Sequence, residues 1–258
     1  MKNELLTIGP VTLYGYGLMI AIGVIAAYMA AEYRAKKYGM RHDRIYALTV
    51  WCFIGGILGA KLLYYITELN DIIADPKLLL KISGGFVVYG GIIGGILAGY
   101  LFCRREKLNF LQYFDLVMPS IALAQGFGRI GCLFAGCCYG IETNSPLGII
   151  FHESKYAPNG VRLVPTQIIS SVLDFIHFFI LITFAKRKKA DGQVAGLYLI
   201  LYSAGRFAIE FFRGDLDRGK VWSISTSQFI SIFTFFIGLV IFIVSGVSVK
   251  KADDKVQE

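Results

Sequence analysis

The amino-acid sequence predicts an all-α integral membrane protein with seven transmembrane helices. Of its 258 residues 55% are hydrophobic and the mean hydropathy is +0.59, which is too apolar for a soluble domain of this length. Stretches of about twenty residues with almost no charge recur along the chain, and this length crosses a hydrocarbon core of about 30 Å. The predicted spans are 13–31, 45–66, 86–103, 113–134, 166–185, 194–212 and 222–247.

The fourth and sixth of these spans each contain an arginine and fit a hydropathy scale worst. The arginines are Arg129 and Arg206. The alternative to a full crossing is a re-entrant segment, which enters and leaves the membrane on the same side.

The 26 lysine and arginine residues are distributed unevenly between the two sides of the membrane. Fifteen fall after the first, third, fifth and last spans, whereas eight fall on the other side. Because an excess of lysine and arginine marks the cytoplasmic side, we expect the N-terminus outside and the C-terminus inside. The formal charge of +8 therefore reflects topology and anionic headgroups, and nucleic acid is not expected as a partner.

We expect residues 1–258 to form a single polytopic membrane domain. The longest polar connections are 67–85 and 136–165, both on the outer side. The second contains Asn144, Pro146, Pro158 and Gly160, which favour turns, and is expected to form a short extracytoplasmic excursion. Residues 250–258 are charged and are expected to form a mobile cytoplasmic tail.

Many of the 29 glycines lie inside the predicted spans. The pairs Gly55/Gly59 and Gly95/Gly99 have the four-residue spacing that lets helices approach closely in lipid, and packing is their expected role. Glycine is denser around residues 126–140 than packing requires. There we expect it to break the helix or to bring backbone N–H groups near a polar ligand.

Three basic residues, Lys61, Arg129 and Arg206, lie within apolar spans. Charge at that depth costs about 2.5–3.5 kcal/mol or more, so such residues are buried against partners or ligands. In a helix, Tyr202, Arg206 and Glu210 fall on one face, and Arg213 follows one turn later. One interpretation is an Arg206–Glu210 ion pair. The other is a guanidinium site for the phosphate of an anionic phospholipid, since two arginines exceed what one glutamate neutralises.

Cys132, Cys137 and Cys138 form a cluster in the sequence. Three interpretations are open: structural thiols, thiols that act at the arginine site, or a metal or redox site. Zinc is weakly indicated, because no second thiolate or histidine pair stands at ligand spacing. A disulfide between the two adjacent cysteines would be strained. A nearby Arg129 would favour the thiolate form.

The whole chain resembles the prolipoprotein diacylglyceryl transferases, which are bacterial membrane enzymes. Five segments carry the resemblance in the same order along the chain. They are YGYGLM (14–19), GAKLLYY (59–65), YGGIIG (89–94), GRIG (128–131) followed by Tyr139-Gly140, and residues 202–213. The resemblance implies seven helices with an outer N-terminus, in the bacterial cytoplasmic (inner) membrane.

The resemblance also implies an activity and a set of residues for it. The diacylglyceryl group of phosphatidylglycerol would be transferred to the lipobox cysteine thiol in a prolipoprotein signal peptide, without cofactor or metal. Arg129 and Arg206 match the essential arginines of the family, and Tyr16, Tyr202 and Glu210 match supporting residues. The expected catalytic residues are therefore Arg129, Arg206, Tyr89, Tyr202 and Glu210. The expected substrate-binding residues are Tyr16, Lys61, Gly90, Gly91, Gly128, Gly131 and Arg213.

The chain departs from the family pattern near the expected acceptor site. Tyr89 stands where histidine is usual, and tyrosine, with a pKa of about 10, is a poor base at neutral pH. Cys132, Ala135 and Cys137 replace two asparagines and a glutamate, while Lys61 replaces arginine and Ser170 replaces glutamate. Two alternatives to the standard reaction follow: a related transferase with another acceptor, and a non-catalytic phospholipid-binding or transport protein.

Overall fold

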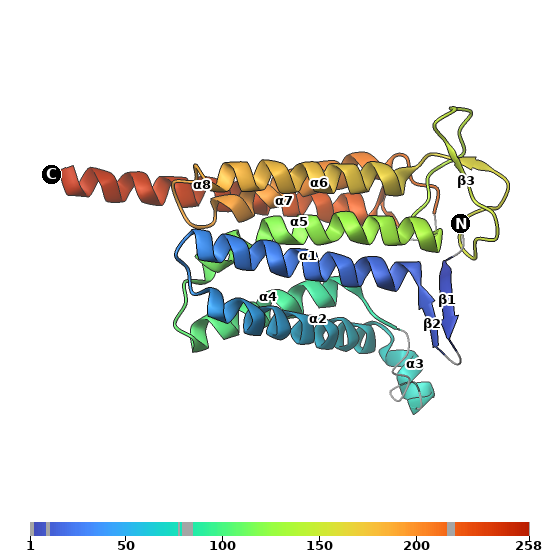
Figure 1. Cartoon of the computed structure of the whole chain (residues 1–258), viewed down its shortest axis with the longest axis horizontal. Helices are drawn as coiled ribbons and strands as arrows, with labels where there is room; N and C mark the ends of the chain where they lie inside the picture. Colours follow the sequence, from blue (N-terminus) through green and yellow to red (C-terminus); the bar gives the residue numbers. More distant parts are fainter. Residues whose placement is uncertain (1–2, 9–10, 77, 79–84, 216–219, 258) are drawn as a thin grey trace. The chain divides into compact units, whose positions relative to one another are not determined.

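The computed structural model describes residues 3–8, 11–76, 78, 85–215 and 220–257, which are mostly helical (Figure 1). Within them, helices of 18 residues or more occupy each of the seven predicted spans. These are α1 (Gly15–Lys37), α2 (Ile45–Thr67), α4 (Val88–Arg105), α5 (Phe110–Ala135), α6 (Thr166–Ala185), α7 (Gln193–Glu210) and α8 (Thr226–Gln257). Two shorter elements, η1 (His42–Arg44) and α3 (Leu69–Ala74), lie in the connections.

Five of the described helices are long and apolar enough to cross a membrane: α1, α2 with the preceding turn, α5, α6 and α8. The arginine-containing α5 is therefore among them, whereas α7 and the glycine-rich α4 are not. Both α5 and α7 are single unbroken helices, which favours crossing over the re-entrant alternative.

In the part of the chain that the structure describes, six short strands form three two-stranded antiparallel sheets, which the all-α prediction did not include. β1 (Glu4–Ile8) pairs with β2 (Val11–Tyr14), so the first helix begins at Gly15 and not at residue 13. β3 (Ile149–Ile150) pairs with β4 (Arg162–Leu163) inside the 136–165 connection, and β5 (Lys220–Val221) pairs with β6 (Ile224–Ser225) before α8. The helix α8 continues to Gln257, so the described part of the 250–258 segment is helical and not an irregular tail.

The chain forms two compact units: residues 32–113, and residues 1–31 together with 114–258. The expectation of one domain over the whole chain stays a prediction. In the 32–113 unit, α2 and α4 pack directly on one another through glycine. A Cβ on Gly94 would meet the carbonyl oxygen of Gly55 and lie 2.9 Å from the Cα of Gly59. The contact therefore uses Gly55 and Gly59 as predicted, with Gly90 and Gly94 as their partners on α4. Gly99 also packs on α2, since its Cβ would lie 3.2 Å from Sγ of Cys52.

The larger unit has its apolar core between α5, α6 and α7. Met118, Ala122, Leu181, Val194 and Ala195 are buried there. A buried carboxylate, that of Asp115 on α5, accepts hydrogen bonds at 2.9 Å from the backbone N–H groups of Gly192 and Ala195, at the start of α7, and from Lys188. This places an anion at a helix N-terminus, where it is favourable.

Of the glycines in the dense 126–140 region, those inside α5 do not break the helix, and the alternative of backbone N–H groups near a polar ligand stays a prediction. Gly126 allows the ring of Phe175 on α6 to approach, since a Cβ would lie 2.6 Å from that ring. Gly131 allows the approach of Tyr16 on α1, and Gly128 faces open space. Only Gly136, with φ of +74°, has a backbone that disfavours other residues, and it lies just beyond the helix end.

Gly94→Ala is expected to destabilise the protein, because its methyl group collides with backbone atoms of α2 that cannot move aside. Overpacking of this kind costs about 1–3 kcal/mol. Gly95→Ala is the matched control on the same helix, since its nearest neighbour would be the Cys52 carbonyl oxygen at 3.5 Å. Thermal unfolding in detergent should show a lower midpoint for Gly94→Ala only; equal midpoints would contradict the packing register.

Candidate active site

A single pocket brings together the two arginines predicted from separate spans. Arg129 of α5 and Arg206 of α7 both line it, together with Asp174 and His177 of α6 and Tyr202 of α7. Its other lining residues are Ser170, Leu173, Gly205 and Ile209. Three helices of the larger unit, α5, α6 and α7, therefore converge on one guanidinium-containing site.

The guanidinium of Arg206 is held by neighbouring side chains. Its Nη1 lies 2.6 Å from Oε2 of Glu210, one turn further along α7, and its Nη2 donates a hydrogen bond to Oγ of Ser227 at 2.8 Å. The two side chains are only 12% and 7% exposed. The predicted ion pair is thus confirmed, and it leaves Arg206 largely neutralised.

Arg129 is much less constrained. Its Nε lies 4.0 Å from Oδ2 of Asp174, beyond hydrogen-bond distance. The Arg129 side chain is 22% exposed, against 7% for Asp174. Among the described residues, this long contact is the ion pair that Arg129 makes. Its N–H groups can therefore bind an anionic ligand in the bidentate manner typical of arginine.

Sequence analysis missed Asp174 and His177, and this changes the expected charge of the site. The prediction of excess positive charge counted one glutamate, but Asp174 faces Arg129 and Asp215 faces Arg213. A carboxylate within an apolar span is as costly as an arginine there, and this criterion could have identified Asp174. The predicted excess of charge is therefore wrong, and the opening for an anion lies at Arg129.

On α7, Tyr202 lines the pocket and stacks on Tyr198 behind it. The rings of Tyr198 and Tyr202 are 5.7 Å apart and nearly parallel, and Tyr198 donates a hydrogen bond to Oε1 of Gln125 on α5 at 2.9 Å. In the described part of the chain, Nδ1 of His177 is buried without a hydrogen-bond partner. The pocket thus contains one open guanidinium and one imidazole nitrogen that is free to accept or donate.

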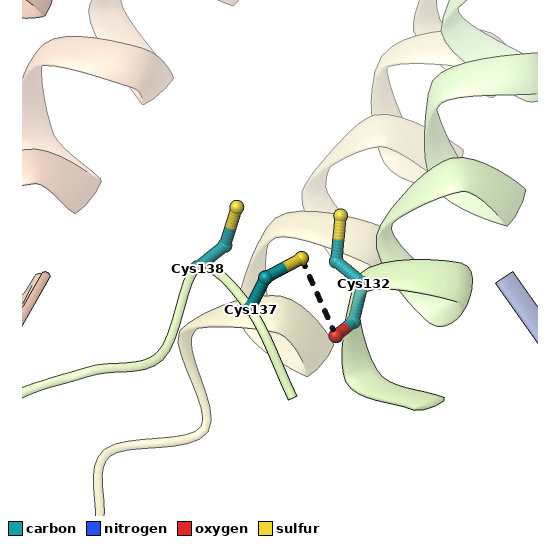
Figure 2. Close-up of side chains that lie close together, drawn as sticks. All are labelled: Cys132, Cys137 and Cys138. Carbon is teal, nitrogen blue, oxygen red and sulfur yellow. Dashed lines mark hydrogen bonds between the residues drawn. The ribbon is translucent and has the colours of Figure 1, made fainter. Parts of the chain in front are cut away.

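The three clustered cysteines lie together in space (Figure 2). Their sulfur atoms are all within 4.8 Å of one another, and none of the five cysteines, all of which the structure describes, forms a disulfide. Cys132 is in the last turn of α5, and Cys137 and Cys138 follow it in the loop. Hydrogen bonds from the thiols of Cys132 and Cys137, together with Arg213, hold the pKa of Cys138 below its usual range. Hydrogen bonds with the thiols of Cys132 and Cys138, together with burial, raise the pKa of Cys137.

Arg213 and Tyr16 border the cysteine cluster. Arg213 donates hydrogen bonds from Nε and Nη2 to the carboxylate of Asp215, at 2.8 and 2.6 Å, and it also contacts Cys138. Because burial is outweighed by these contacts, the pKa of Arg213 lies above its usual value. Tyr16 lies within electrostatic range of all three thiols and of Arg129, which places the predicted residues Tyr16, Gly131 and Arg213 around one locus.

Four predicted site residues belong to the 32–113 unit. The ammonium of Lys61 lies over the rings of Tyr64, Tyr65 and Phe86 at 5.1 to 5.2 Å. Tyr89 is 40% exposed in the first turn of α4. Gly90 and Gly91 face α2, so packing accounts for both glycines, and their roles toward substrate stay predictions.

Comparison with known proteins agrees with the resemblance seen in the sequence. The prolipoprotein diacylglyceryl transferase family profile matches residues 3–244. The chain belongs to this family. A phosphatidylglycerol–prolipoprotein diacylglyceryl transferase of Clostridium tetani is 48% identical over 242 residues, covering 94% of this chain and 97% of the relative. A second, from Clostridium perfringens, is 46% identical (93% and 93%), and one from Staphylococcus aureus is 32% identical (90% and 85%).

The match of the diacylglyceryl transferase family includes the whole candidate site. Residues 3–244 contain both arginines, the acidic residues that face them and the cysteine cluster. What lies beyond is the C-terminal part of α8, which projects past α6 and α7 in Figure 1. The site therefore lies within the matched range and not in an added segment.

Glu210→Gln is expected to destabilise the protein strongly, because it leaves the buried charge of Arg206 without its carboxylate. Removing one partner of a buried ion pair costs about 3–5 kcal/mol. The double variant Arg206→Met with Glu210→Gln removes both charges and should recover most of that loss. Thermal unfolding in detergent measures both effects; an unchanged midpoint for Glu210→Gln would mean that the pair does not hold α7 in place.

Proposed function

We propose that this protein transfers the diacylglyceryl group of phosphatidylglycerol to the lipobox cysteine thiol of a prolipoprotein. The observation that carries the proposal is the convergence of Arg129 and Arg206 on one pocket within the helices. Membership of the family and relatives that bear this activity in their names support the same conclusion. No cofactor is invoked for the arginine site.

The proposed reaction is a displacement at carbon. The acceptor sulfur forms a bond to the glycerol carbon of the lipid, the bond from that carbon to the phosphate oxygen breaks, and glycerol phosphate leaves as an anion. The thiol first releases its proton to water, because the thiolate is the nucleophile. Arg129 supplies donors for the phosphate, so negative charge that develops on the leaving oxygen is stabilised by groups already in position.

Arg206 has a supporting role in this proposal. Glu210 and Ser227 fix its guanidinium, so it presents a rigid, partly neutralised charge to the pocket. A phosphate bound at Arg129 gains from that charge without requiring Arg206 to move. Tyr202 lines the same pocket and is placed to contact the lipid headgroup.

We further propose seven membrane crossings with an outer N-terminus and a cytoplasmic C-terminus, in the bacterial cytoplasmic membrane. With that topology the ends of α5 and α7 and the start of α6 face outward, together with the 136–165 excursion. The cysteine cluster and Arg213 lie at those ends. An exported precursor would meet the enzyme on this side, which agrees with the proposed acceptor.

Two other functions lead to different products. A lipid-binding or transport protein would leave phosphatidylglycerol intact, whereas a transferase releases glycerol phosphate whatever its acceptor. The test is incubation of the purified protein with phosphatidylglycerol and a lipobox peptide, followed by mass analysis of peptide and lipid. A thioether-linked diacylglyceryl peptide is expected. Glycerol phosphate without modified peptide would indicate another acceptor, and no glycerol phosphate would overturn the enzyme assignment.

Arg129→Ala is expected to lower transfer by at least about 100-fold, since one lost donor to a developing oxyanion costs about 10²–10³ in rate. The transfer rate of Arg129→Lys should lie between those of the wild type and Arg129→Ala, because lysine keeps the charge but lacks the planar guanidinium. Arg105→Ala, which changes an exposed arginine elsewhere, is the control and should transfer normally. Initial rates of glycerol phosphate release measure all three; near-normal rates for Arg129→Ala would remove the phosphate-binding role.

A further inference from the structure

The cysteine cluster has the geometry of a metal site with one position left open. A zinc–sulfur bond of about 2.3 Å in tetrahedral coordination separates sulfurs by about 3.8 Å. The three sulfurs are already within 4.8 Å of one another, about 1 Å more than this spacing (Figure 2). In the described ranges, no fourth histidine, cysteine, aspartate or glutamate joins this group.

The loop that carries two of the thiols is held in place independently of them. Oγ1 of Thr166 and Nε2 of Gln167, both at the start of α6, donate hydrogen bonds to the carbonyl oxygens of Cys138 and Cys137 at 2.8 and 2.9 Å. The backbone N–H of Cys137 donates to the carbonyl of Cys132. The arrangement of the thiols is therefore built into the contact between α5, α6 and the loop.

The backbone at Cys138 adopts an unfavourable conformation. Its φ is +62°, a left-handed geometry that costs a residue with a side chain about 1–2 kcal/mol. Such conformations persist where the surrounding structure requires them, and they cluster at functional sites. Here two consecutive cysteines place their sulfurs in the same cluster, which a regular turn would not readily achieve.

The surroundings are also suited to the charge of a metal complex. Three thiolates and one divalent cation carry a net charge of −1. Arg213 contacts Cys138, and Arg129 lies within electrostatic range of Cys132 and Cys138. Cationic groups around a thiolate complex orient the ligands and compensate its charge.

The geometry points to a zinc-binding site formed by Cys132, Cys137 and Cys138, whose fourth position is taken by the acceptor thiol. Soft thiolate ligands favour zinc among the divalent ions of the cell, and three protein ligands with one open position are typical of catalytic zinc. The expectation of no metal rested on spacing in the sequence, which did not show the three sulfurs to be neighbours. The identity of the fourth ligand rests on the proposed function; the metal site itself does not.

In this scheme the metal activates the acceptor. On binding zinc, the acceptor thiol releases its proton to water, because a coordinated thiol is deprotonated. The bound sulfur then forms the bond to the glycerol carbon, the carbon–oxygen bond to phosphate breaks, and glycerol phosphate leaves. The product thioether is a neutral and weaker ligand, so it departs from the metal. No electron transfer is involved.

The first test is the metal content of the full chain, purified with zinc, a reductant and no chelator. About one zinc per chain is expected, with loss of most of it in Cys132→Ser, Cys137→Ser and Cys138→Ser. Cys52→Ser is the matched control and should keep its zinc. Absence of zinc, copper in its place, retention of zinc in all three variants, or a disulfide within the cluster by mass analysis would each overturn the site.

The second test concerns the fourth position. X-ray absorption at the zinc edge should show three sulfurs and one lighter atom, changing to four sulfurs when a lipobox peptide with cysteine is added. The same peptide with serine should cause no change. No change with the cysteine peptide would refute its binding to the metal. Transfer by a zinc-free enzyme would refute the role of the metal but not the proposed function. Bound zinc without transfer would refute the proposed function but not the metal site.

Discussion

The architecture depends on pairing charges that are buried between helices. A single arginine in an apolar bundle would be too costly, and breaking a buried pair is more harmful than never having made it. In the larger unit, Asp115 engages Lys188 and the start of α7, and Glu210 engages Arg206. These contacts link α5 to α7 and α7 to itself, so the same interactions that allow insertion also fix the helices that carry the site.

The two arginines of the pocket are not equally well paired, and the difference indicates which of them binds the ligand. Arg206 has a carboxylate at 2.6 Å and a hydroxyl at 2.8 Å, whereas Arg129 has a carboxylate only at 4.0 Å. An anion gains most where a guanidinium is least satisfied. The two arginines of the pocket therefore have different roles: Arg206 is part of the scaffold, and Arg129 is available to a ligand.

The sequence predicted the features that follow from local patterns and missed those that depend on partners. Hydropathy located all seven long helices, and four-residue spacing predicted the contact between Arg206 and Glu210. It did not reveal that Asp174 faces Arg129, because the two lie on different helices. Likewise Gly55 and Gly59 were assigned to packing correctly, but their partners on α4 are set by the three-dimensional register. The strands of the hairpins were not predicted, because they are too short to show a recognisable alternation of hydrophobic and polar residues.

The chemistry of the acceptor gives the cysteine cluster its place in the molecule. A thiol must lose its proton before it displaces phosphate, and the tyrosine at position 89 is poorly suited to accept one near neutral pH. Cys132 lies one turn beyond Arg129 on α5, so a nucleophile bound at the cluster and a phosphate bound at Arg129 are carried by the same rigid helix. A rigid support of this kind fixes the direction in which sulfur approaches carbon. In the proposed scheme no separate base is needed, because coordination to the metal deprotonates the thiol.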